Sequence, residues 1–269
     1  MSQTDTMERA TAHHNAGRFA EAEGLYRQVL AADPGHLDAL LLLGAALNAQ
    51  GRPQEAEPFL ARVVESRPDL FDAVLLLAMV LGRQDKHLEA AERYRQVIAL
   101  APDFIDGHMN MARHLAADGA VADAIKALSA LTALRPDFEP AFFEMGRLLM
   151  KEGAFDAAAK AFERVVELAP DQAHGYGNLG RVRIVQSRFE EARELLTKAA
   201  EIAPDDHNVY YLLGRARQLD GDMDGAFAAY RQAVAANEDA FKMILKSLEW
   251  SPTGQMWLSP EHLRNALKA

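Results

Sequence analysis

Three glycines in the stretch 174–181, which reads HGYGNLGR, form the pattern G-x-G-x-x-G at Gly175, Gly177 and Gly180. In dinucleotide-binding proteins, glycines at this spacing let the backbone approach the phosphates of the cofactor. The pattern has this meaning only where a strand leads into a helix. Whether it marks a cofactor site here therefore depends on the elements that hold the three glycines.

The composition of the chain excludes several other kinds of chemical site. The chain contains no cysteine, which excludes disulfides, thiolate metal sites and a cysteine nucleophile. Its formal net charge is −10, whereas general binding to nucleic acid needs a basic surface that displaces counterions. The motifs H-E-x-x-H and G-x-S-x-G and the Walker P-loop do not occur in the sequence. We therefore expect no enzymatic activity, no metal site and no nucleic-acid partner.

The bulk of the chain resembles an ordinary soluble protein. Apolar residues make up 49% and charged residues 25% of the 269 residues, which is typical of folded domains. No uninterrupted apolar run approaches the roughly 20 residues that span a bilayer. The beginning of the chain, MSQTDTMERATAHHNAGRF, lacks the apolar core of a signal peptide. We expect a cytoplasmic protein with no segment inserted in a membrane.

The prolines recur with a constant period, which indicates internal repeats. Proline cannot continue a helix, and aspartate, which follows five of the six prolines, favours a helix start. Each Pro-Asp pair therefore predicts the end of one helix and the start of the next. The prolines, each 34 residues apart, are Pro34, Pro68, Pro102, Pro136, Pro170 and Pro204. The seven resulting units are 3–36, 37–70, 71–104, 105–138, 139–172, 173–206 and 207–240.

Equivalent positions of the seven units carry the same kinds of side chain. Position 8 is small, position 20 is alanine, position 24 is large, and position 15 is glycine in five units. Small residues let the two helices of a unit approach closely, and the large ones fill the space beside them. Since a single unit cannot bury its apolar face, the units must stack into a continuous core. Position 8 holds Ala10, Gly44, Ala78, Ala112, Gly146, Gly180 and Gly214, and position 24 holds Tyr26, Leu60, Tyr94, Leu128, Phe162, Leu196 and Tyr230.

These columns closely resemble the tetratricopeptide repeat family, and the resemblance covers residues 3–240. It implies an all-α fold, an α-solenoid of helix-turn-helix repeats that forms a right-handed superhelix. The chain departs from the family pattern at Arg9, in a usually apolar position, and at Glu238, where a seventh proline is expected. Residues 241–269 are expected to form a C-terminal capping helix and a tail that contains both tryptophans.

The register of the repeat decides whether the three glycines mark a cofactor site. Gly180 occupies position 8, in the same column as Gly146 and Gly214, and no predicted strand precedes its helix. A dinucleotide site needs that strand, so we interpret Gly180 as a packing residue and expect no cofactor. Gly177 is not explained by the repeat, and it costs about 1 kcal/mol of helix stability relative to alanine.

The resemblance also implies where a partner binds. In this family the first helix of each unit lines the concave groove of the superhelix, and extended peptides or partner helices lie in that groove. Position 5 of this helix is apolar in every unit except at Gly177. The missing side chain would leave a pocket between Phe143 and Tyr211, or the glycine relieves packing against a neighbouring helix, and the sequence leaves both interpretations open.

Position 9, which also faces the groove in this family, is arginine in four consecutive units: Arg113, Arg147, Arg181 and Arg215. A row of like charges indicates an anionic ligand, because the planar guanidinium binds carboxylates in bidentate fashion. The alternative is local pairing, for which Glu144 has the correct spacing from Arg147. Arg181 and Arg215 have no carboxylate three or four residues away.

Asn110 and Asn178 occupy position 6, another groove position of the family. One subclass of the family binds the C-termini of chaperones through a carboxylate clamp, in which such asparagines act together with lysines at positions 2 and 5. No unit of this chain has lysine at either position. Chaperone docking is therefore not expected.

Two further columns carry charge. Asp38, Asp72 and Asp106 occupy position 2, where a carboxylate in the first helical turn favours the helix dipole; we prefer this structural role, although it leaves the groove acidic toward its N-terminal units. Arg183 and Arg217 replace the usual apolar residue of position 11. Either their stems pack while the charged ends reach solvent, or they widen the basic strip.

We interpret the chain as a non-catalytic adaptor or scaffold that binds a peptide or helix of another protein, with acidic groups selected by the arginines and apolar anchors at Phe143, Gly177 and Tyr211. A first alternative is a self-assembling scaffold, in which the tail with Trp250 and Trp257 enters a second copy instead of packing on its own array. A second alternative is a recognition subunit of a separate enzyme, because units such as GRFAEAEGLYRQVLAADP resemble those ahead of glycosyltransferase or sulfotransferase domains.

Overall fold

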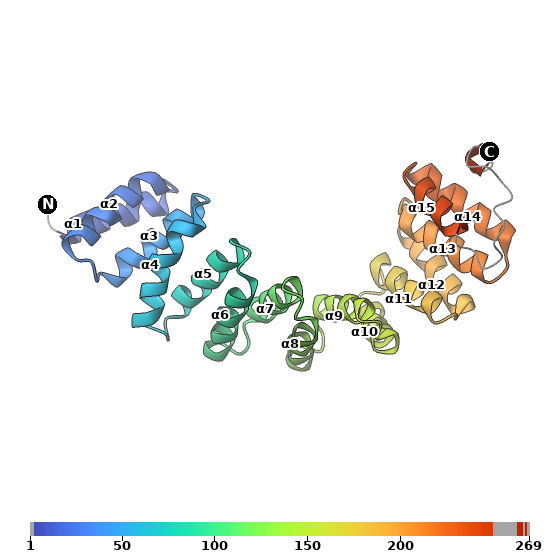
Figure 1. Ribbon diagram of the computed structural model, residues 1–269, viewed down its shortest axis with the longest axis horizontal. Helices are drawn as coiled ribbons and strands as arrows, with labels where there is room; N and C mark the ends of the chain where they lie inside the picture. The colour runs from blue at the N-terminus through green and yellow to red at the C-terminus, as the bar shows by residue number, and fades with distance from the viewer. Residues whose placement is uncertain (1–2, 250–262, 266, 268–269) are drawn as a thin grey trace. The chain divides into compact units, whose positions relative to one another are not determined.

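The computed structural model of the chain describes residues 3–249, 263–265 and 267 (Figure 1). Residues 3–249 form fifteen α-helices, residues 263–265 and 267 are also helical, and no strand occurs among the described residues, which confirms the all-α prediction. The first helices of successive repeats are α1 (Gln3–Asn15), α3 (Leu37–Ala49), α5 (Phe71–Gly82), α7 (Ile105–Ala117), α9 (Glu139–Lys151), α11 (Ala173–Val185) and α13 (His207–Leu219). The second helices are α2 (Phe19–Ala32), α4 (Pro53–Ser66), α6 (His87–Leu100), α8 (Val121–Leu134), α10 (Phe155–Leu168), α12 (Phe189–Ile202) and α14 (Met223–Ala236), and α15 (Ala240–Glu249) follows them.

The helices belong to two compact units. The N-terminal unit, Met1–Leu134, contains α1 to α8, and the C-terminal unit, Arg135–Ala269, contains α9 to α15. Within each unit every helix packs against the next one along the chain, and first helices of adjacent repeats also touch, such as α3 with α5 and α11 with α13. This stacking of helix pairs is the arrangement of an α-solenoid. None of the described helices has the length and apolarity that crossing a bilayer needs.

Small and large residues pair within each repeat as the columns predict. A Cβ atom at Gly44 would lie 2.6 Å from Leu60, one at Gly146 would lie 2.8 Å from Phe162, and one at Gly180 would lie 2.7 Å from Leu196. Position 8 must therefore stay small because the side chain of position 24 fills the space above it. For Gly180 this contact confirms the packing role, since it lies inside α11, which follows α10 and not a strand.

The residue at position 15 turns the chain between the two helices of a repeat through a left-handed conformation. The five glycines at this position have φ angles from 72° to 91°. Asp85 and Ser187 replace glycine in the third and sixth repeats and adopt the same conformation, with φ angles of 56° and 58°. A left-handed residue that carries a Cβ atom costs about 1–2 kcal/mol, so these two turns are strained. The five glycines are Gly17, Gly51, Gly119, Gly153 and Gly221.

The loops between repeats correct one expectation. The aspartate of each Pro-Asp pair does not cap the following helix: α5 begins at Phe71, two residues after Asp69, and its N-cap is Leu70. The carboxylate of Asp69 instead accepts a hydrogen bond from Arg67 in the same loop. The proline is also not required to end the second helix, because α14 ends at Ala236 with the same length as the other second helices although Glu238 stands in place of proline.

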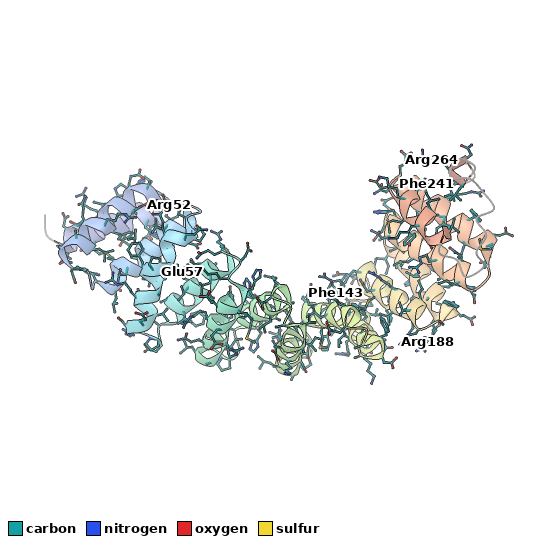
Figure 2. All side chains as sticks on the ribbon, in the orientation of Figure 1. Arg52, Glu57, Phe143, Arg188, Phe241 and Arg264 are labelled. Atoms are coloured by element: carbon teal, nitrogen blue, oxygen red, sulfur yellow. The ribbon has the colours of Figure 1, made fainter. Side chains whose placement is uncertain are left out.

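Equivalent ion pairs join successive repeats of the N-terminal unit. Glu23 of α2 accepts hydrogen bonds from Gln50 and Arg52 of the next repeat, and Glu57 of α4 accepts from Gln84 and Lys86 of the repeat after that. Burial raises the pKa of Glu57, but the hydrogen bonds from Lys86 and Gln84 outweigh it and hold the pKa below its ordinary value. Figure 2 labels Arg52 and Glu57, which take part in the two pairs.

The C-terminal helix α15 covers the last repeat. Its residues Phe241 and Ile244 are buried in one cluster with Tyr230 of α14. Leu263 and Leu267 of the tail are buried in the same cluster, and the guanidinium of Arg264 lies 4.6 Å from the centre of the Phe241 ring (Figure 2). These tail residues therefore pack on the chain's own helices. Trp250 and Trp257 lie outside the described residues.

Candidate partner-binding surfaces

The first helices of the C-terminal unit bring six of the predicted site residues to equivalent places. Residues four apart lie on one face of a helix, so each first helix presents its position 5 and position 9 side chains together. We call this surface the C-terminal arginine face. It consists of Phe143 and Arg147 on α9, Gly177 and Arg181 on α11, and Tyr211 and Arg215 on α13.

The three arginines of this face differ in their surroundings. Arg147 forms the predicted local ion pair with Glu144, at 3.1 Å, and an exposed pair of this kind contributes little to stability. Arg181 is exposed and makes no hydrogen bond or ion pair with any residue that the structure describes. Arg215 has no carboxylate partner in the described part of the chain, and its guanidinium lies 6.0 Å from the ring centre of Tyr211. Local pairing therefore accounts for Arg147 alone.

Three other arginines of the same unit are neutralised by carboxylates. Arg164 pairs with Glu167, Arg188 with Glu191, and Arg193 with Asp220 at 2.8 Å. Arg188 is labelled in Figure 2. Arg181 and Arg215, at position 9, therefore differ from these three arginines because they have no carboxylate partner among the described residues.

The space around Gly177 is open, although the residue itself is buried. A Cβ atom there would meet only Cγ2 of Val209, at 3.9 Å, whereas the position-8 glycines are all filled from the second helix. No close packing therefore requires glycine at position 177. On the neighbouring helix α9, the Phe143 ring meets the His174 ring edge to face, with 4.9 Å between the centres.

His174 and Glu139 form a contact that the sequence analysis missed. Nε2 of His174 lies 2.8 Å from Oε1 of Glu139, which joins α11 to α9 beside Phe143. Asn178, one of the predicted site residues, donates its side-chain amide to the backbone oxygen of His174. The two residues of the pair are 35 apart, so only alignment of positions 1 and 2 of adjacent repeats could have indicated the contact.

Two of the predicted site residues lie in the N-terminal unit. Arg113 on α7 is exposed, and its Nη1 donates a hydrogen bond of 2.7 Å to Oδ1 of Asn110. These residues are bonded to each other within one helix. Four residues before Asn110, Asp106 is exposed and has no hydrogen bond or ion pair among the described residues.

Arg183 and Arg217 do not widen the arginine face. The side chain of Arg183 is buried and forms ion pairs with Glu163 of α10 and Glu191 of α12. Arg217 donates a hydrogen bond of 3.0 Å to the backbone oxygen of Gly225 at the start of α14. Both residues therefore brace helix contacts. The charge of Arg183 is paired, whereas Arg217 has no carboxylate partner among the described residues.

A pair of histidines joins α6 to α7. Nδ1 of His87 lies 3.2 Å from Nδ1 of His114, and the His114 ring stacks on Tyr94 with 5.7 Å between the centres. Burial lowers the pKa of His114, and the charges of His87 and Arg113 lower it further. No group of three or more potential metal ligands occurs in the part of the chain that the structure describes. The sequence analysis missed this pair because its members belong to different repeats.

Comparison with family models decides the membership of the chain. The model described as tetratricopeptide repeat matches residues 14–80, 83–144 and 149–216, and a second model with the same description matches residues 207–240. The chain belongs to the tetratricopeptide repeat family. This confirms the resemblance in the sequence, and the general function of such repeats is to serve as a scaffold for protein interaction. A comparison with curated proteins gives no match.

Solved structures of tetratricopeptide repeat proteins share the fold. The chain is 21% identical to the MamA protein, with a TM-score of 0.58 over 64% of this chain and 94% of MamA. It is 20% identical to YrrB, a TPR protein described as having an unusual peptide-binding site, with a TM-score of 0.56 over 68% of this chain and 95% of YrrB. The C-terminal part of a TPR protein from Cytophaga hutchinsonii gives a TM-score of 0.74 at 16% identity, over 90% of this chain and 99% of that one. Identities this low support the fold alone.

Proposed function

We propose that the chain is a non-catalytic adaptor that binds a segment of another protein on the C-terminal arginine face. The observation that carries the proposal is that Arg181 and Arg215 stand in equivalent places on adjacent first helices, without a carboxylate partner among the described residues. An acidic segment supplies the missing partner, since a guanidinium binds a carboxylate through two parallel hydrogen bonds. Other arginines of the unit, such as Arg183 and Arg193, already have a carboxylate partner within the chain.

Apolar anchoring accompanies the charge in this proposal. An apolar side chain of the partner lies over Gly177, where an added Cβ atom would meet only Val209, between the columns that hold Phe143 and Tyr211. Burying such a side chain contributes about 1.5–3 kcal/mol. Arg181 lies one helical turn from Gly177, so the partner segment combines an apolar anchor with a nearby acidic group.

The tail supports the adaptor over the self-assembling scaffold. Leu263 and Leu267 are buried against α15 of the same chain, so part of the tail already has a binding place. A tail that inserts into a second copy would first have to release these leucines. The alternative of a recognition subunit for a separate transferase finds no specific observation in its favour.

The test compares three baits in a pull-down from a lysate of the source cell, with the retained proteins identified by mass spectrometry. The baits are the wild type, Arg181→Glu/Arg215→Glu, and the control Lys160→Glu/Lys246→Glu. The control changes the net charge equally, at exposed lysines that have no ion pair in the described part of the chain. A partner that wild type and control retain and the arginine variant loses supports the proposal, provided that circular dichroism shows all three baits equally helical. The proposal is wrong if the three baits retain the same proteins.

A further inference from the structure

The helices α3 and α5 of the N-terminal unit are apolar on all sides. Their sequences are LDALLLLGAALNA and FDAVLLLAMVLG, and the charged residue in each is the aspartate of position 2. A helix that is apolar all round is normally buried on every side. These two helices are packed against the second helices α2, α4 and α6, and the second helices do not cover the face of positions 2, 5, 6 and 9 completely.

This face is only partly covered. Leu41 and Leu42 of α3 and Leu75 and Leu76 of α5 are half-buried. Met79, at position 9 of α5, is 43% exposed. The second helices of the unit, by contrast, carry charged side chains on their solvent side, such as the ion-paired Glu55 and Arg95. These partly exposed apolar side chains form a strip along α3 and α5. Exposed apolar surface of this kind is typical of sites that bind another protein.

Unpaired carboxylates border this strip. Asp38, Asp72 and Asp106, on α3, α5 and α7, are exposed and make no hydrogen bond or ion pair with any described residue. Each lies in the first turn of its helix, so the three carboxylates follow the same edge of the strip. Their favourable interaction with the helix dipole explains why they are tolerated there, but it leaves their charge available to a ligand.

We propose that this surface binds an amphipathic segment of a partner protein whose polar side carries lysine or arginine. We call the surface the N-terminal acidic face, and it consists of Asp38, Leu41, Leu42, Asp72, Leu75, Leu76, Met79 and Asp106. The apolar side chains of the segment cover the leucines and Met79, and its cations lie along the row of aspartates. Complementary charge fixes the orientation of such a segment and rejects acidic ones.

The charges of the N-terminal acidic face disfavour an acidic partner. No cation stands among its eight residues, and none of α3 or α5 is basic. Among the arginines and lysines of the first helices, Arg113 on α7 is the nearest in sequence to this surface, and its side chain is bonded to Asn110. The face lies within the N-terminal unit, so the inference does not depend on the function proposed for the arginines of the C-terminal unit.

The test measures the binding of a fluorescent peptide to the full chain by anisotropy at physiological ionic strength. The probe is an amphipathic Leu/Lys peptide of about 14 residues, which is four helical turns, and a Leu/Glu peptide with the same pattern is its counterpart. We expect the wild type to bind the Leu/Lys peptide and not the Leu/Glu peptide. Asp38→Asn/Asp72→Asn/Asp106→Asn should weaken binding about tenfold, because three exposed ion pairs are lost together.

Matched variants separate this surface from the acidity of the whole chain. Glu21→Gln/Glu65→Gln/Glu89→Gln removes three exposed carboxylates from second helices of the same unit, and it should change the affinity less than twofold. Met79→Gln should weaken binding several-fold, whereas Leu88→Gln, at an exposed leucine of α6, should not. The inference is overturned if the wild type does not bind the Leu/Lys peptide, or if the two triple variants bind it equally.

Discussion

Ser187 has the left-handed backbone conformation that glycine adopts at the same position of most other repeats. Its φ angle is 58°, its side chain is exposed, and its hydroxyl makes no hydrogen bond with any described residue that could offset the strain. Glycine relieves the clash of the Cβ atom but loses more backbone entropy on folding. We expect Ser187→Gly to raise the free energy of unfolding by about 1 kcal/mol, the difference between these two effects.

Urea denaturation followed by circular dichroism measures this change. The control is Ser187→Ala, which keeps the Cβ atom and should give no gain. If Ser187→Gly unfolds at the same urea concentration as the wild type, the left-handed turn carries no strain that glycine can release.

Gly177 and Gly180 stand three residues apart in α11 and should respond to alanine in opposite ways. At Gly177 the added methyl group meets only Val209, at 3.9 Å, so helix propensity should raise the free energy of unfolding by up to about 1 kcal/mol. At Gly180 the methyl group would lie 2.7 Å from Leu196, and overpacking should lower the free energy of unfolding by about 1–3 kcal/mol.

A longer side chain at Gly177 links stability to binding. Gly177→Leu should remain as helical as the wild type and lose the partner, because leucine occupies the open space that the proposed function assigns to the partner's anchor. The measurement is urea denaturation for stability and the pull-down for binding. Retention of the partner by a well-folded Gly177→Leu variant would remove Gly177 from the binding surface.

At the scale of elements, the contact between α6 and α7 depends on the uncharged form of His114. The pKa of His114 is lowered by burial, and then by His87 and Arg113, while Asp85 lies 4.0 Å from the other nitrogen of His87. Because the folded state binds a proton at His114 less readily than the unfolded state does, stability rises with pH. It should fall as the pH drops below about 6.5, the ordinary pKa of histidine, toward the lower pKa of the folded state.

The measurement is the free energy of unfolding in urea at about pH 7.5 and about pH 5.5, on either side of the ordinary histidine pKa. His114→Gln should reduce the difference between the two values. His207→Gln removes a histidine without a described hydrogen bond or ion pair and serves as the control. Equal differences in the wild type and His114→Gln would show that this contact does not sense pH.

The elements themselves were largely predictable from the sequence. A period of 34 residues aligns every small, large and turn position, so helices and their pairing follow from any single repeat. Contacts that differ between repeats were not predictable. His87 with His114 and Glu139 with His174 depend on the distance between particular helices and on side-chain rotamers, and periodicity carries no information on either. The left-handed conformation of Asp85 could not be predicted either, because aspartate occurs in several kinds of turn.

At the scale of the whole molecule, each of the two units contains buried clusters of its own. One cluster of buried residues runs from Ala10 to Val97, within the N-terminal unit, and others, such as that of Tyr230, lie within the C-terminal unit. In solenoids each repeat contacts only its neighbours, so stability is roughly a sum of local terms. A cut between repeats should therefore leave each side folded.

We expect the fragment 1–134, which ends with α8 as the N-terminal unit does, to be helical and to unfold cooperatively in urea. It should bind the Leu/Lys peptide within about twofold of the full chain, because contacts in a solenoid are local and the N-terminal acidic face lies wholly inside the fragment. The control fragment 1–117 lacks α8 and leaves α7 without the partner helix of its repeat, so it should unfold at a lower urea concentration. If the fragment 1–134 is unfolded while the full chain is stable, the C-terminal unit contributes to folding of the N-terminal one, and the local account of its stability is wrong.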